Sequence, residues 1–228
     1  MKKITKLLLI FALLGNSISV FAQTHTTHEV PNAPAFNAIA VSGGDINVFF
    51  TQGEGYAFTI SGAAKLIKAT KIKVKDNILI IDYNQPFFTA DDNDITVYVN
   101  APLLNEISVS GEADFKNQTP LQGQSLNIKT QKNGEVSLKN INIGQLKIET
   151  KGSSSVDIDY IEANKIIISS SDRSEVELSG TTGQLEILKK GMFTEIDTGK
   201  LLTTQMGNSK TNSQKVNKDG SIEFVFNN

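Results

Sequence analysis

The chain has 228 residues, carries 22 basic and 24 acidic side chains, and contains neither cysteine nor tryptophan. The lack of cysteine excludes disulfides, thiolate metal sites and a lipid-modified cysteine anchor. Both histidines, His25 and His28, lie in a polar stretch near the N-terminus. Because histidine is the commonest general base, a conventional histidine-dependent active site is not expected.

Residues 1–22 have the pattern of a secretory signal peptide. Three lysines precede the apolar run Leu7–Leu14, which is too short to span a bilayer, and Val20 and Ala22 supply the small residues of a cleavage site. Without these lysines, 19 basic residues face 24 acidic ones, and the net charge of −5 argues against binding to nucleic acid or to an anionic membrane. No later segment has the apolar length of a membrane span. We therefore expect an exported protein in the periplasm, in the medium or at the cell surface.

The first part of the exported chain is expected to contain short β elements. Residues 23–35 are rich in Thr, His, Pro and Asn and are interpreted as a flexible lead-in. Residues 36–103 alternate in polarity and predict a β unit with hairpins, of which Ile72–Ile81 is the clearest. Residues 63–69 fit a helical turn. This unit therefore combines short strands with tight turns.

The aromatic residues of this unit fall into two groups. Phe87 and Phe88 follow Pro86 in a predicted loop and form a candidate exposed contact patch. The others lie in predicted strands and are interpreted as mostly core: Phe49, Phe50, Tyr56 and Phe58.

Residues 104–214 repeat with a period of about 20 residues. Columns of apolar residues keep this spacing: Ile128, Ile148 and Ile168; Val136, Val156 and Val176; Leu138, Ile158 and Leu178. Columns in step are typical of a parallel solenoid, in which each coil presents the same inward positions to its neighbours. We therefore predict an all-β fold, a right-handed parallel β-helix of about five coils, followed by a C-terminal strand or cap in residues 215–228. An antiparallel β-sandwich is the alternative.

Segments of both halves carry a family resemblance. Phe36–Gly43 matches Leu104–Gly111 in pattern, and the Ile72–Ile81 hairpin lies between them. Together with Val97–Gly111 (VYVNAPLLNEISVSG), they resemble the family called putative auto-transporter adhesin, head GIN domain, which is common in the Bacteroidetes. The resemblance covers about residues 36–210, implies an exported solenoid-like β fold, and supplies no catalytic residues. Family members carry Ser-Gly-Ser-Gly-like turns that this chain lacks, which weakens any inherited turn-based function.

A group of acidic residues is the candidate site. If the apolar columns point inward, six carboxylates share one outer face with no lysine among them: Asp157, Asp159, Glu175, Glu177, Glu195 and Asp197. Opposed like charges about 4.8 Å apart cost about 0.2–1 kcal/mol per pair. Bound Ca²⁺ would offset this repulsion, but no Asp-x-Asp-Gly loop accompanies the residues, and a solvated charged face explains them as well. No cofactor is expected. Ca²⁺ is the one candidate for a bound ion.

The favoured function is non-enzymatic. We expect an extended β surface that is presented to a glycan or to another partner in the cell envelope. The first alternative is a polysaccharide lyase or hydrolase that uses the acidic face, although Arg173 and scattered lysines are the only cations available to it. The second alternative is a structural or stress-response domain of the periplasm. The ligand and the oligomeric state do not follow from the sequence.

Overall fold

The structure, a computed structural model, describes residues 25–83, 95–206, 213–216 and 222–225. The predicted signal peptide and the Phe87–Phe88 pair lie outside these residues. Within the described part, the chain is predominantly β-strand, as the all-β prediction requires.

Seven strands and one short helix precede Pro102 in the described part. They are β1 (His25–Val30), β2 (Ala38–Gly43), β3 (Ile46–Gln52), β4 (Ala57–Ala63), α1 (Ala64–Ala69), β5 (Lys71–Lys75), β6 (Ile78–Tyr83) and β7 (Ile95–Ala101). The later strands are longer on average. They are β8 (Glu106–Gly111), β9 (Asp114–Asn117), β10 (Leu121–Lys132), β11 (Glu135–Gly152), β12 (Ser155–Ser170), β13 (Glu175–Lys190), β14 (Glu195–Met206), β15 (Ser213–Val216) and β16 (Ile222–Val225).

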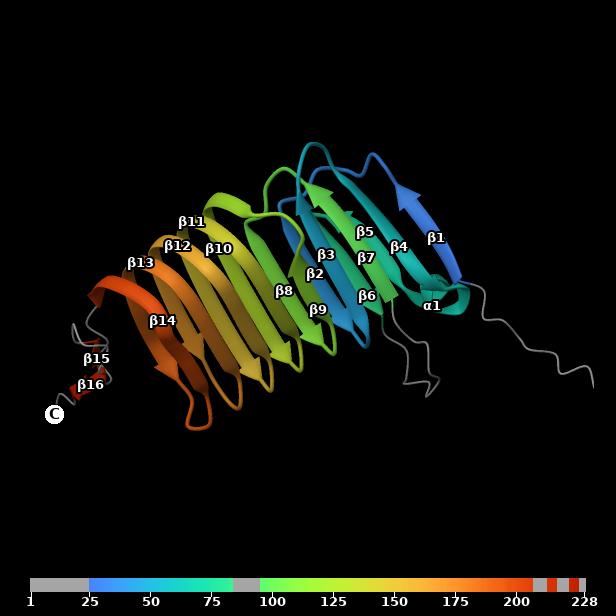
Figure 1. The fold of residues 1–228 in the computed structure, drawn as a ribbon. Helices are drawn as coiled ribbons and strands as arrows, with labels where there is room; N and C mark the ends of the chain where they lie inside the picture. The colour runs from blue at the N-terminus through green and yellow to red at the C-terminus, as the bar shows by residue number, and fades with distance from the viewer. Residues whose placement is uncertain (1–24, 84–94, 207–212, 217–221, 226–228) are drawn as a thin grey trace, which may run out of the picture.

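Successive coils of the chain stack into a solenoid whose strands form one 14-stranded sheet (Figure 1). Face A contains β5, β6, β2 and β8 and the later parts of β10 to β14. Face B contains β1, β4, β7, β3 and β9 and the early parts of β11 to β14. From β8 onward, neighbouring coils pair in parallel, as the 20-residue period predicts. The parallel solenoid is therefore confirmed, and the alternative antiparallel sandwich is wrong.

The apolar columns expected from the sequence form the core of the solenoid. Their members pair in register across successive coils, and each is at most 1% exposed. These columns are Ile128–Ile148–Ile168 on face A, and Val136–Val156–Val176 and Leu138–Ile158–Leu178 on face B. Because adjacent strands lie about 4.8 Å apart, equivalent side chains of neighbouring coils touch and exclude water. Stacking of coils thus stabilises a chain whose single coils have no core of their own.

The N-terminal strands belong to the same solenoid, but their order in space differs from their order in sequence. β2 lies between β6 and β8 and is parallel to both, and β3 lies in the same way between β7 and β9. The β2–β3 coil is therefore inserted between the β6–β7 coil and the β8–β9 coil. The shared pattern of Phe36–Gly43 and Leu104–Gly111 gains a structural meaning, because Ile39 pairs with Ile107 and Gly43 with Gly111.

Several local features agree with the sequence, and one differs. β5 and β6 form the predicted hairpin, α1 forms at the predicted helical turn, and β16 forms at the predicted C-terminal strand and pairs with β15. Residues 23–35 were expected to be a flexible lead-in, but His25–Val30 form β1, antiparallel to β4. Backbone pairing at the edge of face B and the extended preference of threonine explain this largely exposed strand.

Buried hydroxyl groups line the corner that leads from face A to face B. Oγ1 of Thr130 lies 2.8 Å from Oγ of Ser154, and Oγ1 of Thr150 lies 2.5 Å from Oγ of Ser170. Ser174 Oγ completes the group, because it accepts a hydrogen bond from Thr150 at 2.9 Å and lies 2.7 Å from Ser170 Oγ. Each of these hydroxyls is buried and has a hydrogen-bond partner, so the polar corner is compatible with an apolar interior.

Candidate functional site

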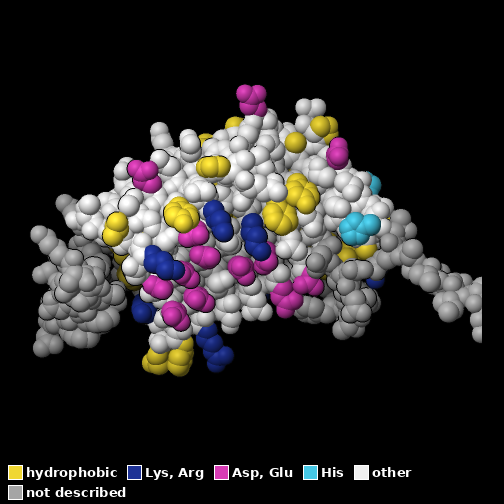
Figure 2. Space-filling view, viewed as in Figure 1, with side chains coloured by type: hydrophobic (Ala, Val, Ile, Leu, Met, Phe, Trp, Pro, Cys, Tyr) yellow, Lys and Arg dark blue, Asp and Glu magenta, His cyan; other side chains and the backbone are white. Residues whose placement is uncertain are grey.

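Face B presents a regular row of outward side chains that crosses eight strands. Every second residue of a strand points away from the core, and strand pairing keeps these residues in register. We call this set the central row; from β4 to β14 it consists of Thr59, Tyr98, Phe49, Lys116, Ser137, Asp157, Glu177 and Asp197. Its chemistry changes from aromatic through basic to acidic along the solenoid. Figure 2 shows acidic side chains gathered over the later coils, with lysines beside them.

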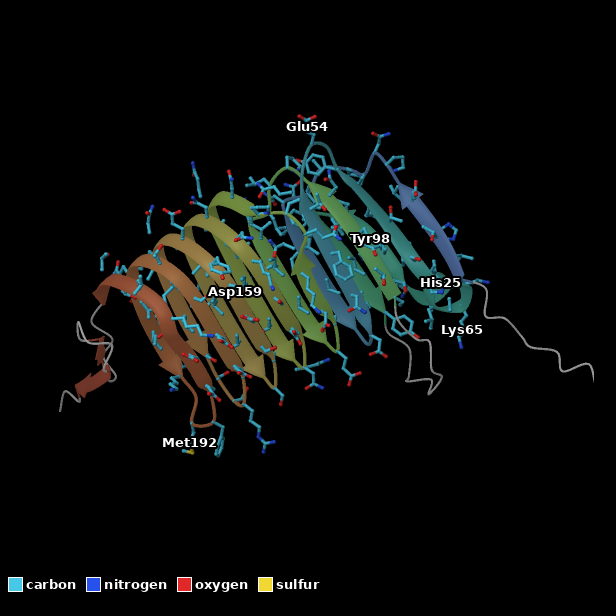
Figure 3. All side chains as sticks on the ribbon, viewed as in Figure 1. His25, Glu54, Lys65, Tyr98, Asp159 and Met192 are labelled. Atoms are coloured by element: carbon cyan, nitrogen blue, oxygen red, sulfur yellow. The ribbon has the colours of Figure 1, made fainter. Side chains whose placement is uncertain are left out.

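The aromatic end of the central row is a stacked pair. The ring centroids of Phe49 and Tyr98 lie 5.5 Å apart, with an angle of 21° between the ring planes, and Tyr98 is 45% exposed. Figure 3 shows Tyr98 on the same side of the solenoid as Asp159. Phe49 was expected to belong to the core, but this residue alternates with the buried Val48 and Phe50 and therefore points outward. Face B thus carries an accessible aromatic surface.

Polar side chains border the aromatic pair. Asn100 lies two residues beyond Tyr98 and donates hydrogen bonds to the carbonyl oxygens of Glu54, at 2.7 Å, and Gly55, at 3.0 Å. These bonds fix the β3–β4 loop beside the pair. The other flanking positions on β3 and β7 are Asn47, Thr51 and Thr96. Aromatic faces with amides and hydroxyls around them can pack against the C–H groups of a sugar ring and bind its hydroxyls.

Two lysines separate the aromatic pair from the acidic residues. Lys116 pairs in register with Phe49, and its ammonium nitrogen lies 3.7 Å from a carboxylate oxygen of Asp114. Lys139 pairs in register with Asp159 of the next coil. Surface ion pairs contribute at most about 1 kcal/mol, so Lys116 can exchange its partner for an anionic group of a ligand.

The acidic residues predicted to share a face lie together on face B. Asp157, Glu177 and Asp197 pair in register in the central row, and Glu175 pairs with Glu195 in the row beside it. Four of these five side chains are exposed, and that of Glu177 is half-buried. Among the residues that the structure describes, no three histidine, aspartate or glutamate side chains are arranged to hold a metal ion.

Two of the carboxylates have direct partners. Asp159 accepts a hydrogen bond from the hydroxyl of Ser179 at 2.8 Å, and Nζ of Lys200 lies 3.4 Å from Oε1 of Glu177. From the sequence, no lysine was expected among the acidic residues. A register shift after Glu177 pairs Lys200 with Ser179 and so brings this lysine to the acidic group.

Asp157 is the most perturbed of these carboxyl groups. Partial burial raises its pKa, and the Glu177 and Asp159 carboxylates beside it raise it further. Lys139 and Lys200 act in the opposite direction but do not cancel the rise. Burial and repulsion together thus make Asp157 the carboxyl group of this surface that is most easily protonated.

The acidic end of face B is predictable from the sequence, whereas its aromatic end was missed. A signal was present, because Val97 and Val99 are core positions and Tyr98 between them must point outward. Strand order supplied the rest. β3 and β7 lie far apart in sequence, and only their pairing brings Phe49 to Tyr98.

The fold and face B define the class of protein, a parallel β-solenoid with its chemical groups on an open sheet surface. The family model described as putative auto-transporter adhesin, head GIN domain, matches residues 35–156, more than half of the chain. The chain belongs to this family, as the resemblance predicted. No curated protein matches the chain.

Solved structures share this fold. Crystal structures described as putative adhesins from Parabacteroides distasonis and Parabacteroides merdae both have a TM-score of 0.71, at 23% and 22% identity. Each match covers 81% of this chain and 77% of the other. A Parabacteroides distasonis structure described as a putative lipid binding protein has a TM-score of 0.67 at 16% identity, covering 81% of this chain and 78% of its own. At such identities the likeness shows the fold alone.

α1 has six residues, and no described helix is long and apolar enough to cross a bilayer.

Proposed function

We propose that this protein is an exported, non-enzymatic adhesin that binds glycans of a cell envelope on face B. The stacked pair of the exposed Tyr98 and the half-buried Phe49 is the observation that carries the proposal. The pair lies among hydrogen-bonding side chains, and Lys116 is its neighbour in the central row. Family membership supports a role in adhesion. The proposal assigns sugar stacking to the aromatic pair and hydroxyl binding to its polar border.

The form of the acidic surface supports a binding role over catalysis. Asp157 and Asp197 are exposed on an open sheet, and Lys200 pairs with Glu177 between them. His25 and His28 lie on β1, at the far edge of the same sheet. General acid–base catalysis needs a base positioned beside the reacting group, and neither histidine lies beside the acidic residues.

A glycan-binding assay with two matched tyrosine variants tests the proposal. The protein is applied to an array of neutral and acidic glycans, and affinities for the best ligands are measured by calorimetry. We expect Tyr98→Ala to weaken binding about tenfold, because it removes one face of the aromatic pair. Tyr160→Ala removes another exposed tyrosine, outside the pair, and should leave affinity unchanged. Equal losses in the two variants, or no loss in Tyr98→Ala, would contradict the proposal.

The same assay separates the alternative functions. Product release from acidic polysaccharides that is lost in Asp157→Asn or Glu177→Gln would identify an enzyme and overturn the binding proposal. A protein that binds no glycan at all would fit the structural or stress-response alternative.

Calcium binding by the acidic rows is a separate hypothesis. These rows consist of Asp157, Glu177 and Asp197, with Glu175 and Glu195 beside them. Thermal melting with and without millimolar CaCl₂ tests it, because a bound ion raises the melting temperature by mass action. We expect no shift beyond that produced by the same ionic strength of NaCl. A calcium-specific rise that is lost in Asp157→Asn would establish the site.

A further inference from the structure

A second exposed apolar feature lies at the turn between β13 and β14. Leu188, Met192 and Phe193 are 56%, 91% and 71% exposed, and Lys189 and Lys190 between them are exposed as well. We call the segment Leu188–Phe193 the β13–β14 tip. Figure 3 shows Met192 at its outer end, pointing away from the body of the solenoid. This tip lies in the later coils, far along the stack from the aromatic pair.

The fold itself does not require apolar residues at this corner. Gly191 donates its N–H to the carbonyl oxygen of Ser170, just as Ser171 of the preceding coil donates to Thr150, so the two turns are equivalent. In the preceding coil the outermost residues are Asp172 and Arg173, and one coil earlier they are Gly152 and Ser153. Neither of these two corners carries a large apolar side chain. The change to Met192 and Phe193 therefore needs another explanation.

Leu188 joins the tip through a β-bulge. Ile187 pairs with Ile168, but Lys189 pairs with Ser169, so Leu188 is an extra residue without a counterpart in the preceding coil. An inserted residue of this kind bends the strand and redirects side chains. Here it leaves a leucine in solvent beside two lysines. A contiguous set of exposed apolar side chains marks a contact surface, whereas single ones are ordinary.

The charges around the tip indicate what it contacts. Lys189, Lys190 and the exposed Arg173 of the preceding corner lie at its base. The acidic residues nearest in sequence are Glu186, whose carboxylate lies 2.8 Å from Nζ of Lys165, and Glu195, which begins β14. Asp172 of the preceding corner accepts the N–H of Gly152 at 3.1 Å. Apolar side chains with a collar of cations suit an anionic bilayer, where the apolar groups enter the acyl boundary and the cations remain at the phosphates.

The size of the tip argues against a protein partner. A stable protein interface buries about 800 Å² on each partner, whereas a leucine, a methionine and a phenylalanine bring at most about 200 Å² each. A lipid surface has no such requirement, because a few side chains suffice for shallow, reversible insertion. We propose that the β13–β14 tip inserts into the surface of an anionic lipid bilayer. The acidic residues elsewhere repel such a surface, so the attraction is local and weakens as salt screens the cations.

Vesicle flotation of the full chain tests this inference. Binding is compared between vesicles of phosphatidylcholine alone and vesicles that also contain phosphatidylglycerol, at low and high salt. We expect binding to the anionic vesicles only, with a loss of about tenfold or more in the double variant Met192→Ser/Phe193→Ser. Leu202→Ser is the matched control, because Leu202 is 73% exposed but lies outside the tip. Lys189→Gln/Lys190→Gln should reduce the preference for anionic vesicles by a similar factor.

Four outcomes would overturn the inference. They are no binding to anionic vesicles, equal binding to both kinds of vesicle, an equal loss in Leu202→Ser, and self-association that the double variant abolishes. Circular dichroism and thermal melting establish that the variants are folded. Tyr98→Ala should retain vesicle binding, so the result is independent of the glycan proposal.

Discussion

Two adjacent phenylalanines show how the direction of a side chain decides its role in this protein. Phe49 stacks on Tyr98 at the outer surface, whereas Phe50 is fully buried and stacks on Phe115 with ring centroids 6.2 Å apart. The two residues have the same chemistry and lie on the same strand. Only the alternation of a β-strand separates a candidate ligand contact from a core residue.

Neighbouring coils approach each other very closely at Gly111. Its φ is +97°, and a Cβ atom would lie 1.9 Å from the carbonyl oxygen of Gly43 in the adjacent coil. We expect Gly111→Ala to lower the free energy of unfolding by about 3 kcal/mol, measured by urea denaturation, because backbone strain and a steric clash combine. Gly55 also has a positive φ, +75°, but no atom within 4 Å of its Cβ position. Gly55→Ala should therefore cost only about 1 kcal/mol, and equal costs would exclude the clash as the cause.

The raised pKa of Asp157 leads us to expect that the stability of the folded chain depends on pH. Its pKa is raised in the folded chain above the ordinary value of 3.8, so the folded state binds this proton more tightly than the unfolded state. Its contribution to stability is favourable at low pH and is lost as the pH rises through the folded pKa. At pH 7, Asp157→Asn should therefore raise the melting temperature by about 1–2 °C, because it removes a partly buried charge that Glu177 also repels.

A measurement at pH 3 and a second variant are the controls for this prediction. At pH 3 Asp157 is protonated in both states, so the gain from Asp157→Asn should disappear. Glu149 forms an ion pair with Lys147, and Glu149→Gln should not raise the melting temperature at either pH. A gain of equal size at pH 3 and pH 7 would show that the charge of Asp157 is not its cause.

At the scale of elements, edges and corners limit how the coils associate. β5 is the terminal strand of face A, and its outward residues Lys71, Lys73 and Lys75 are all exposed. A row of lysines on an edge strand prevents pairing with another sheet, because like charges would meet. The corners are stabilised differently, by hydroxyls that bond to one another across coils. The elements thus combine parallel pairing inside the stack with charge at its edge.

Loss of one corner hydroxyl should lower the free energy of unfolding. Ser174 is 1% exposed, donates to the carbonyl oxygen of Ser171 at 2.7 Å and accepts from Thr150 at 2.9 Å. We expect Ser174→Ala to lower the free energy of unfolding by about 1–2 kcal/mol, because it removes the hydrogen bonds of Ser174 with Thr150, Ser170 and the carbonyl oxygen of Ser171 from a buried corner. Ser153 occupies the preceding corner but is exposed, so Ser153→Ala should change stability by less than about 0.5 kcal/mol. Chemical denaturation of both variants decides between the two expectations.

At the scale of the whole molecule, stability depends on contacts between neighbouring coils, as in other repeat proteins. A coil in the middle of the stack has a neighbour on each side, whereas, among the described strands, β14 pairs with β13 alone. The later end of the stack should therefore open more readily than its middle.

Core truncations at two places test this difference. Ile148 is fully buried in the middle of the stack, and Leu201 is 6% exposed on β14. Ile148→Ala should cost about 3 kcal/mol and reduce hydrogen-exchange protection throughout the stack. Leu201→Ala should cost less, because the open end can relax, and should reduce protection in β14 alone. A global loss of protection from Leu201→Ala would show that the solenoid unfolds as a single unit.

Much of the architecture could be predicted from the sequence because the relevant signals are local or periodic. The 20-residue columns specify the parallel register, since a shift by one residue would turn Ile148 out of the core. The β5–β6 hairpin is encoded in its own turn, where Asp76 and Asn77 adopt positive φ. The position of the β2–β3 coil is not encoded locally. It depends on long-range packing, for which Phe36–Gly43 offered only a similarity to Leu104–Gly111.

The sequence by itself determined the all-β class, the 20-residue period and the outward acidic residues, because alternation and period follow directly from strand geometry. Only the tertiary structure decided which rows meet. Inserting the β2–β3 coil beside β7 brings Phe49 to Tyr98, and a register shift brings Lys200 to Glu177. A bulge without a counterpart in the repeat exposes Leu188 next to Met192 and Phe193. These arrangements depend on pairing between distant segments and on local departures from the period, and neither can be derived from the repeat alone.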